Sequence, residues 1–446
     1  MARILFGCVP FWGHINPTIA VAQKLIELGH TVTYACHSEM RGAFDKAGIP
    51  FVENYEFCDL FVKLNQMVSS HTMSDLRKEL KKANEKLLHI PAAQLEPNVN
   101  DFVRLIDEWQ PDVCVFDIFF LPGRLAAEVR GIPFVFSCCA MSLMLPSKDL
   151  LPVGYGFPSY RKRPDLHGAI KLLLSGWFAN KLLRYINSIR ARFSLKPQGH
   201  VGQEPGYLYI NYSTPALDFK RSDLPSQVYY LGPSISKDQY GADTEFPWDW
   251  LDGRPLVYVT MGTFFTKKKV FDQVIAASKG ASWQVVMSVT KHMDVSQWQD
   301  IPDNVLIRNF VPQSKLMKKV SAVVCAGGSN TTTEALLLGI PLLVMPQATD
   351  HFDNAQRVVE AKAGFRLDPK QLSVKKIRHA ITKMLIDPSY RRHAREIAAD
   401  YEKCDAPLAG AQLVLKLAEK KQPLYRPSHI GPTIYKDNMN EVLASI

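Results

Sequence analysis

Short runs of apolar residues alternate along the chain with longer stretches in which apolar positions recur every three or four residues. Apolar runs of four to six residues predict buried strands, and they lie at residues 4–9, 31–36, 113–116, 133–137, 256–261, 284–289, 305–309, 322–325 and 342–345. Amphipathic stretches such as 373–386, 389–403 and 408–420 predict helices. Alternating strands and helices are typical of parallel sheets, so we expect an α/β fold.

The length of 446 residues suits two domains of about 200 residues each. Residues 222–255 are rich in Pro, Gly and Asp and predict a domain connection. We therefore predict a first domain over 1–221, a second over 256–426 and a tail over 427–446 that is expected to cross back onto the first domain. Within the connection, Tyr229-Tyr230-Leu231-Gly232-Pro233 is expected to lead into the second domain.

Composition excludes several classes of protein. With 47% hydrophobic and 22% charged residues, the chain is typical of globular proteins. The first nine residues look like a strand and not a signal peptide, and no uncharged apolar run reaches about 18 residues. The eight cysteines lack metal-site spacing and are expected to be buried thiols in the cytoplasm. The net charge of +10 fits either a phosphate-bearing ligand or simple solubility, and no nucleic-acid motif accompanies it.

A glycine turn follows the predicted strand at 322–325. Ala326-Gly327-Gly328-Ser329 lets the backbone turn sharply, and Asn330 or Thr331 is placed to cap a helix that runs to about residue 338. A helix N-terminus offers unpaired N–H groups and a positive dipole end, which suit a phosphate. Glu334, one helical turn later, is placed to reach ribose hydroxyls. Such turns also occur without a ligand, so this motif alone predicts only an anion site.

Two polar residues follow predicted strands of the first domain. His14 comes after the apolar run 4–9, and we expect it on a loop, with Asn16 capping the next helix and Pro17 at its first position. Asp117 ends the strand 113–116. Ligands of open α/β sheets bind at the carboxyl ends of strands, so both residues are site candidates. A surface role for His14 and a helix-capping role for Asp117 stay open, and the latter does not exclude a site role.

The order of residues in the second half carries more information than the glycine turn. Phe310-Val311-Pro312-Gln313, Gly327-Gly328-x-Asn330-Thr331-Thr332-x-Glu334-Ala335, Gly339-x-Pro341 and Pro346…Asp350-His351…Asn354-Ala355 occur in that order over about 45 residues. This arrangement resembles the donor-binding signature of family 1 nucleotide-sugar-dependent glycosyltransferases, which include bacterial macrolide and plant natural-product enzymes. The resemblance implies the GT-B fold, in which two Rossmann-like doubly wound domains face each other across a cleft.

The chain departs from that signature at two positions. The family usually has Trp in place of Phe310, where it stacks on the nucleotide base. It usually has His in place of Ala326, where it contacts the diphosphate. Ala326 has only its backbone N–H to offer, which puts the mode of diphosphate binding in question.

The resemblance also implies a role for each matched residue. It makes His14 the catalytic base and Asp117 the residue that orients it, as the Gly-His…Asn-Pro motif of the family suggests. The donor-binding residues are expected to be Gly262, Thr263, Phe310, Val311, Gln313, Ala326, Gly327, Gly328, Asn330, Thr331, Glu334, Asp350 and His351. The acceptor-binding residues are expected to be Phe11, Trp12, Phe119 and Met144.

The expected reaction is transfer of a sugar, with inversion, from a UDP- or dTDP-sugar to a hydroxyl of a small lipophilic acceptor. The expected partners are therefore small molecules, without nucleic acid. No Asp-x-Asp pair occurs in the chain, so neither a metal nor another cofactor is expected. Two other functions stay open. A nucleotide-sugar epimerase would bind the same donor, and a non-catalytic auxiliary protein would fit the loss of the family histidine at Ala326.

Two segments of the first half have a distinctive composition. Residues 143–160 form a loop rich in Pro, Gly and aromatic residues, the kind of segment that lines an acceptor pocket. Residues 161–196 carry nine Lys and Arg but one acidic residue, Asp165. An amphipathic helix with a solvated basic face explains the second segment, and a peripheral contact with a membrane surface is the alternative.

Overall fold

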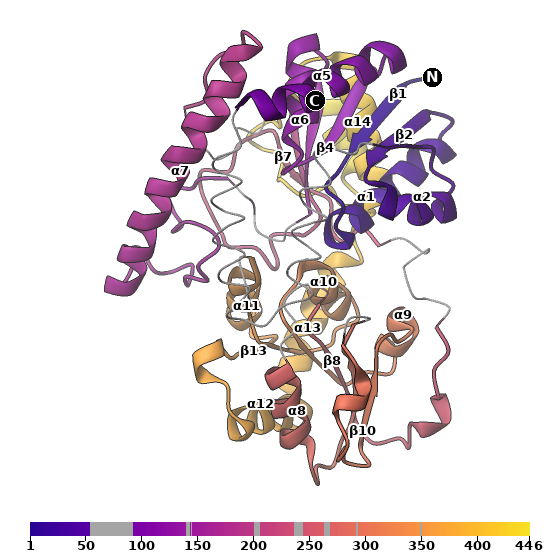
Figure 1. The fold of residues 1–446 in the computed structure, drawn as a ribbon, viewed down its shortest axis with the longest axis vertical. Coiled ribbons are helices and arrows are strands. Elements are labelled where there is room, and N and C mark those ends of the chain that lie inside the picture. Colours follow the sequence, from indigo (N-terminus) through magenta and orange to yellow (C-terminus); the bar gives the residue numbers. More distant parts are fainter. Residues whose placement is uncertain are drawn as a thin grey trace.

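The structure is a computed structural model that describes residues 1–53, 92–139, 143, 145–199, 206–235, 244–262, 268–290, 293–347 and 350–446. Figure 1 shows two α/β domains, one above the other, each built around its own sheet. Every pairing between named strands is parallel. The expected fold of two Rossmann-like domains is confirmed, and it is the GT-B fold.

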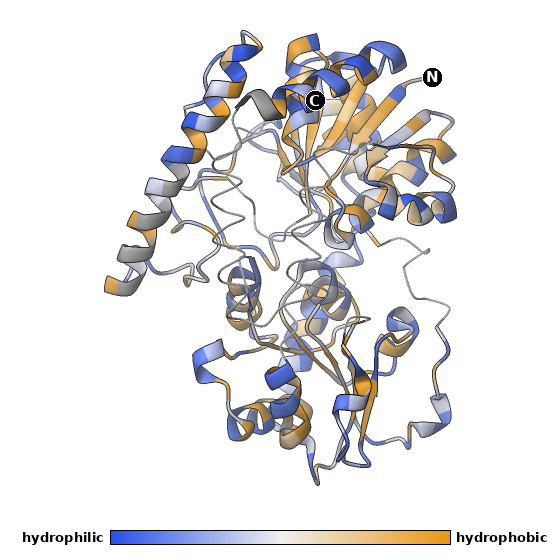
Figure 2. Cartoon of the chain, viewed as in Figure 1, coloured by the Kyte–Doolittle hydropathy of each residue, from blue (hydrophilic) through white to orange (hydrophobic). Residues whose placement is uncertain are grey.

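The first domain contains a seven-stranded sheet in the order β3-β2-β1-β4-β5-β6-β7. Its strands are β1 (Arg3–Gly7), β2 (Thr31–Cys36), β3 (Phe51–Glu53), β4 (Val113–Asp117), β5 (Phe134–Cys138), β6 (Leu208–Asn211) and β7 (Val228–Tyr230). The central strands are buried along almost their whole length, as expected of strands covered by helices on both faces. In Figure 2 these strands form an apolar layer beneath helices with mixed surfaces.

The helices of the first domain are α1 (Trp12–Glu27), α2 (Arg41–Ala47), α5 (Ala92–Trp109), α6 (Leu121–Arg130) and α7 (Leu166–Arg192), with the short 3-10 helix η1 (Ser38–Met40). Helix α6 ends at Gly131, whose φ of 65° suits glycine. Helix α7 covers most of the basic segment 161–196, and Asp165 caps it by accepting from the Gly168 N–H at 2.7 Å. In Figure 1, α7 runs along the outside of the molecule.

The second domain contains a six-stranded sheet in the order β10-β9-β8-β11-β12-β13. Its strands are β8 (Leu256–Thr260), β9 (Gln284–Ser288), β10 (Val305–Arg308), β11 (Ala322–Cys325), β12 (Leu342–Val344) and β13 (Gly364–Arg366). Its helices are α8 (Lys268–Ser278), α9 (Gln313–Met317), α10 (Ser329–Leu337), α11 (Asp350–Glu360), α12 (Val374–Ile386) and α13 (Pro388–Tyr401), with η2 (Trp248–Trp250), η3 (Val295–Gln297) and η4 (Pro369–Gln371).

The end of the chain contacts the first domain again. Helix α14 (Ala406–Lys420) buries Leu413 and Leu417 in the core of the first domain, so the chain crosses before residue 427. The Tyr230 N–H donates to the Pro432 carbonyl at 2.8 Å, and the Ile434 N–H donates to the Tyr230 carbonyl at 2.9 Å. Helix α15 (Met439–Ser445) closes the chain.

Two further expected boundaries are wrong. Strand β7 pairs with β6, so the Tyr229–Pro233 run belongs to the first sheet and does not lead into the second domain. Helix α1 begins at Trp12, with Phe11 before it, so His14 lies in the first helical turn and Pro17 lies inside the helix. The His14 N–H and the Ile15 N–H both donate to the Phe11 carbonyl, so the turn is already closed upstream of Asn16.

No helix within the described ranges is long and apolar enough to span a membrane. The seven cysteines in those ranges are free and buried.

Candidate active site

His14 and Asp117 meet at the carboxyl edge of the first sheet. Strands β1 and β4 are neighbours, which places the turn after β1 beside the end of β4. The His14 Nδ1 and Asp117 Oδ2 atoms are 2.7 Å apart. Asp117 Oδ1 accepts from the Phe119 N–H at 2.9 Å, and the residue before helix α6 is Phe120, so Asp117 does not cap that helix. The Asp117 side chain is fully buried, whereas 21% of the His14 side chain is exposed.

The surroundings of His14 favour its protonated form. Burial lowers the pKa of His14, but the charge of Asp117, the hydrogen bond to Asp117 and the charge of Asp350 outweigh it, so the pKa is raised above 6.5. Since Nδ1 faces Asp117, Nε2 is the ring nitrogen left for a substrate proton. Asp350 belongs to the second domain, so both domains set the charge at this imidazole.

Aromatic rings lie on both sides of the imidazole. The centroids of Phe11 and Phe119 are 5.9 Å and 5.6 Å from that of His14, and Phe119 is 45% exposed. The Cys139 thiol also contacts this residue, because it donates to the His14 carbonyl at 3.0 Å. Two of the expected acceptor residues, Phe11 and Phe119, therefore lie beside His14, and a third, Trp12, is the first residue of α1. The fourth, Met144, lies outside the described residues.

The glycine turn between β11 and α10 has the expected form. Gly327 has a φ of 91°, and a Cβ atom there would lie 2.7 Å from Val344 Cγ1 and 3.1 Å from the His351 carbonyl oxygen. Glycine is therefore required at this position. Asn354 Nδ2 donates to the Gly327 carbonyl at 2.7 Å and so fixes the turn against helix α11.

The helix after the turn begins earlier than expected. Gly328 precedes α10 and no side chain caps it, so Asn330 and Thr331 lie inside the first turn. Instead of capping, Asn330 Nδ2 donates to the Trp12 carbonyl at 3.3 Å. The first turn of α10 therefore contacts the first turn of α1 across the domain boundary.

Two of the expected donor residues, Glu334 and Gln313, are hydrogen-bonded to each other. Gln313 Nε2 donates to Glu334 Oε2 at 2.7 Å, and the Tyr258 hydroxyl donates to Gln313 Oε1 at 2.9 Å. This relay holds the Glu334 carboxylate of α10 at the first residue of α9. Phe310 and Val311 directly precede α9 and lie half-buried and buried.

A pocket lies between the two domains at this point. Asn330 and Glu334 line it from the second domain, and Asn16, Cys139 and Tyr212 line it from the first. The last three were not expected as site residues. The Asn-Pro pair after His14 was a usable signal for Asn16, whereas Cys139 and Tyr212 follow β5 and β6 without any motif.

Asp350 and His351 form the start of α11. Asp350 Oδ2 accepts from Asn354 Nδ2 at 3.2 Å and from the Ser329 hydroxyl at 3.5 Å. A Cβ atom at Gly328 would lie 3.9 Å from His351 Nε2, so the His351 ring lies beside the glycine turn. Burial lowers the pKa of His351, which favours its neutral form near pH 7.

The remaining expected donor residues lie at the edge of this region. Ala326 follows β11 and is buried, and Gly262 forms an exposed turn with a φ of 71° after β8. Thr263 lies outside the described residues. In the described part of the chain, the one set of possible metal ligands with suitable spacing is His14, Asp117 and Cys139. In this set, His14 Nδ1 and Asp117 Oδ2 are already hydrogen-bonded to each other. Burial also raises the pKa of the Cys139 thiol well above its ordinary value.

Comparisons with known proteins agree with this geometry. Residues 273–417 match the family described as erythromycin biosynthesis protein CIII-like, C-terminal domain. The 4'-demethylrebeccamycin synthase of Lentzea aerocolonigenes is 27% identical over 93% of this chain and 99% of its own length. Among solved structures, the glycotransferase of kitacinnamycin has a TM-score of 0.70 at 19% identity, covering 95% of this chain and 99% of its own.

A second solved relative is known with two ligands. The spinosyn rhamnosyltransferase SpnG has a TM-score of 0.65 at 21% identity, covering 93% of this chain and 99% of its own in complex with thymidine diphosphate. Its complex with spinosyn aglycone gives the same score over 94% of this chain and 100% of its own. Taken with the two parallel sheets, these matches show that the chain has the GT-B fold and is similar over almost its whole length to nucleotide-sugar-dependent glycosyltransferases of natural products.

Proposed function

We propose that this enzyme transfers a sugar, with inversion, from a UDP- or dTDP-sugar to a hydroxyl group of a small lipophilic acceptor. The observation that carries the proposal is the 2.7 Å contact between His14 and Asp117 opposite the first turn of α10. Relatives named for rebeccamycin and spinosyn chemistry support an acceptor of the natural-product class.

His14 is the base of the proposed reaction. Its Nε2 takes the proton of the acceptor hydroxyl as the oxygen attacks the anomeric carbon. Asp117 holds the imidazole in the tautomer with hydrogen on Nδ1 and stabilises the imidazolium that forms. Phe11 and Phe119 give the acceptor an apolar surface beside the base.

The second domain binds the donor in this proposal. The N–H groups at the start of α10, together with Asn330 and Thr331, stabilise the charge of the departing diphosphate. Asp350 and His351 contact the sugar hydroxyls from the start of α11. Because Ala326 is buried and apolar, the backbone and α10 supply the contacts that a histidine would otherwise make. No metal is part of the proposal.

The test is an assay of nucleoside diphosphate release and product formation with UDP-glucose and dTDP-glucose and a panel of phenols and macrolide aglycones. His14→Ala should lower the transfer rate by about 10²–10⁴-fold, the range of general base catalysis, and leave binding of dTDP and UDP unchanged. His379→Ala, an exposed histidine on α12, is the matched control and should keep full activity. Equal rates for His14→Ala and the control would overturn the proposal. Donor conversion without any acceptor would favour the epimerase.

The location of the enzyme is a separate part of the proposal. The free, buried cysteines support a reducing compartment, such as the cytoplasm. On α7, Leu166, Leu173 and Trp177 are exposed beside Lys181 and Arg184, which supports a peripheral contact with anionic membranes. Co-sedimentation with vesicles tests that contact. Binding that is independent of anionic lipid, or absent, would remove it.

A further inference from the structure

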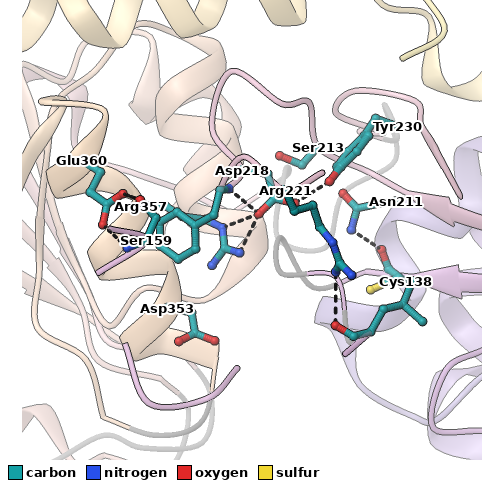
Figure 3. Close-up of polar contacts among 12 residues, drawn as sticks. Cys138, Ser159, Asn211, Ser213, Asp218, Arg221, Tyr230, Asp353, Arg357 and Glu360 are labelled. Atoms are coloured by element: carbon teal, nitrogen blue, oxygen red, sulfur yellow. Dashed lines mark hydrogen bonds and ion pairs between the residues drawn. The ribbon is translucent and has the colours of Figure 1, made fainter. Parts of the chain in front are cut away.

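Helix α11 contacts both the donor turn and the first domain. Asp350 and Asn354 face Ser329 and the Gly327 carbonyl. Asp353, Arg357 and Glu360, spaced four and three residues apart, lie on a common face and contact residues of the first domain. We call Asp353, Arg357 and Glu360 the latch face. Figure 3 shows Glu360 turned toward Ser159 and Arg357 turned toward Asp218.

The two carboxylates of the latch face accept hydrogen bonds from a single segment of the first domain. Asp353 accepts from the N–H groups of Gly154 at 2.5 Å and Gly156 at 2.7 Å. Glu360 accepts from the Ser159 N–H at 2.8 Å and the Ser159 hydroxyl at 2.5 Å. Two carboxylates of the second domain thus bind four donors of the first domain. Charged acceptors make such hydrogen bonds about twice as strong as neutral ones.

The backbone fits closely against α11 at Gly156. A Cβ atom there would lie 2.7 Å from the Phe352 carbonyl oxygen and 2.6 Å from Arg366 Nη1, and the φ of Gly156 is 65°. Arg366 Nη1 also donates to the Gly156 carbonyl at 2.7 Å. The contact therefore depends on a glycine and involves both the N–H and the carbonyl of the same residue.

The other end of this segment is fixed to the first domain. Asp223 accepts from the Lys148 N–H at 2.5 Å and the Ser147 hydroxyl at 3.0 Å, and Arg221 Nη1 donates to the Leu145 carbonyl at 3.2 Å. We call residues 145–160 the strap. It begins six residues after Cys139, which contacts His14, and ends on the latch face of the donor-binding domain. The strap thus spans the two halves of the site.

A buried ion pair holds the latch face in place. Arg357 donates to Asp218 Oδ1 from Nη2 at 2.6 Å and from Nε at 3.0 Å, and both side chains are at most 5% exposed. The Tyr230 hydroxyl donates to Asp218 Oδ2 at 2.5 Å, and the Arg357 guanidinium lies 4.2 Å from the centroid of the Phe219 ring. This ion pair fixes the centre of α11 against the first domain (Figure 3).

We propose that Asp353 and Glu360 are positioning residues that hold the strap as the wall of the acceptor side of the cleft, so that acceptor binding depends on the latch face while nucleotide binding does not. This inference rests on the proposed function for its acceptor. The strap carries the stacked rings of Tyr155 and Phe157, whose centroids are 5.5 Å apart, and a flat apolar acceptor would suit such rings.

The test compares Asp353→Asn with Asp294→Asn in the full-length enzyme. Asp294 is an exposed carboxylate that also accepts from a backbone N–H, so its loss is the matched control. In Asp353→Asn, hydrogen exchange of the strap amides and trypsin cleavage at Lys148 and Arg161 should both rise at least tenfold. The affinity for dTDP and UDP, measured by calorimetry, should stay within about twofold.

Activity gives a second readout on the same variants. With 4-methylumbelliferone as the acceptor probe, Asp353→Asn should raise the acceptor KM about tenfold with little change in the donor KM. Ser159→Ala removes one hydrogen bond to Glu360 without altering α11. It should raise the exchange of the strap amides and the acceptor KM by smaller factors than Asp353→Asn does. It replaces Asp353→Asn as the test variant if Asp353→Asn does not fold.

Two results would overturn the inference. One is hydrogen exchange of the strap amides that stays at the wild-type rate in Asp353→Asn and in Ser159→Ala, which would mean that other contacts hold the strap. The other is a parallel loss of nucleotide affinity, which would make Asp353 a support of the donor site itself. Hydrogen exchange and trypsin cleavage of the strap do not depend on catalysis by His14. A failure of the proposed function is therefore distinguishable from a failure of the contact between the latch face and the strap.

Discussion

The two domains place different chemistry at the same structural position. In each domain a buried parallel strand ends in a turn that opens a helix, and the turn lies at the carboxyl edge of the sheet. After β1 the first helical turn carries an imidazole, His14. After β11 the turn consists of Gly327 and Gly328 and exposes backbone N–H groups. The architecture thus sets where a site forms, and the residues of the turn decide whether it is a base or an anion-binding site.

The first test of this comparison changes the surroundings of the His14 imidazole in the first domain. Asp117→Asn removes the charge that raises the pKa of His14, so burial should then dominate and lower that pKa. Neutral His14 is the active base, so wild-type kcat/KM should rise with pH through a pKa above 6.5. In the variant this rise should move to lower pH while the plateau falls by about a hundredfold or more.

The measurement is kcat/KM against pH for both proteins, with thermal unfolding as a control for folding. A variant whose rise stays at the wild-type pH would contradict the claim that Asp117 sets the charge of His14.

The second test alters the glycine turn. Gly327→Ala forces a residue with a Cβ into a φ of 91° and against Val344, which should cost about 1–3 kcal/mol of folding free energy. Because the turn positions the N–H groups of α10, the affinity for dTDP and UDP should fall about tenfold or more.

Gly253→Ala is the matched control for that variant. Its φ is 90°, but a Cβ there meets no atom within 4 Å, so it carries the backbone strain without the steric contact. Chemical denaturation and calorimetry on both variants separate the two effects. Equal loss of nucleotide affinity in both would show that the glycine turn has no special role in binding.

The sequence predicts the strands better than the helix starts. Buried parallel strands are continuous apolar runs, so β2 and β11 match their predicted ranges residue for residue. The start of α1 was misplaced because Asn16-Pro17 is a good local signal for a helix N-terminus, whereas the chain closes its first turn at Phe11. Likewise, Asn330 contacts Trp12 of the other domain, and no local pattern encodes that contact.

The contacts between domains were beyond the reach of sequence reasoning. Arg357 and Asp218 are 139 positions apart, and Asp353 and Gly156 are 197 apart, so neither pair produces a periodic or motif signal. Strand β7 was assigned to the connection because a three-residue strand leaves too short an apolar run between Pro-rich and Gly-rich segments. The candidate donor residues were predicted from an ordered motif, and His14 and Asp117 also from their positions after predicted strands.

The most direct test of the account is a crystal structure of the enzyme with dTDP or UDP bound. We predict that the diphosphate lies at the first turn of α10, against the N–H groups after Gly327 and beside Asn330. His14 should face the position of the transferred sugar from the other domain. A nucleotide bound elsewhere, or a His14 side chain turned away from the diphosphate, would contradict it.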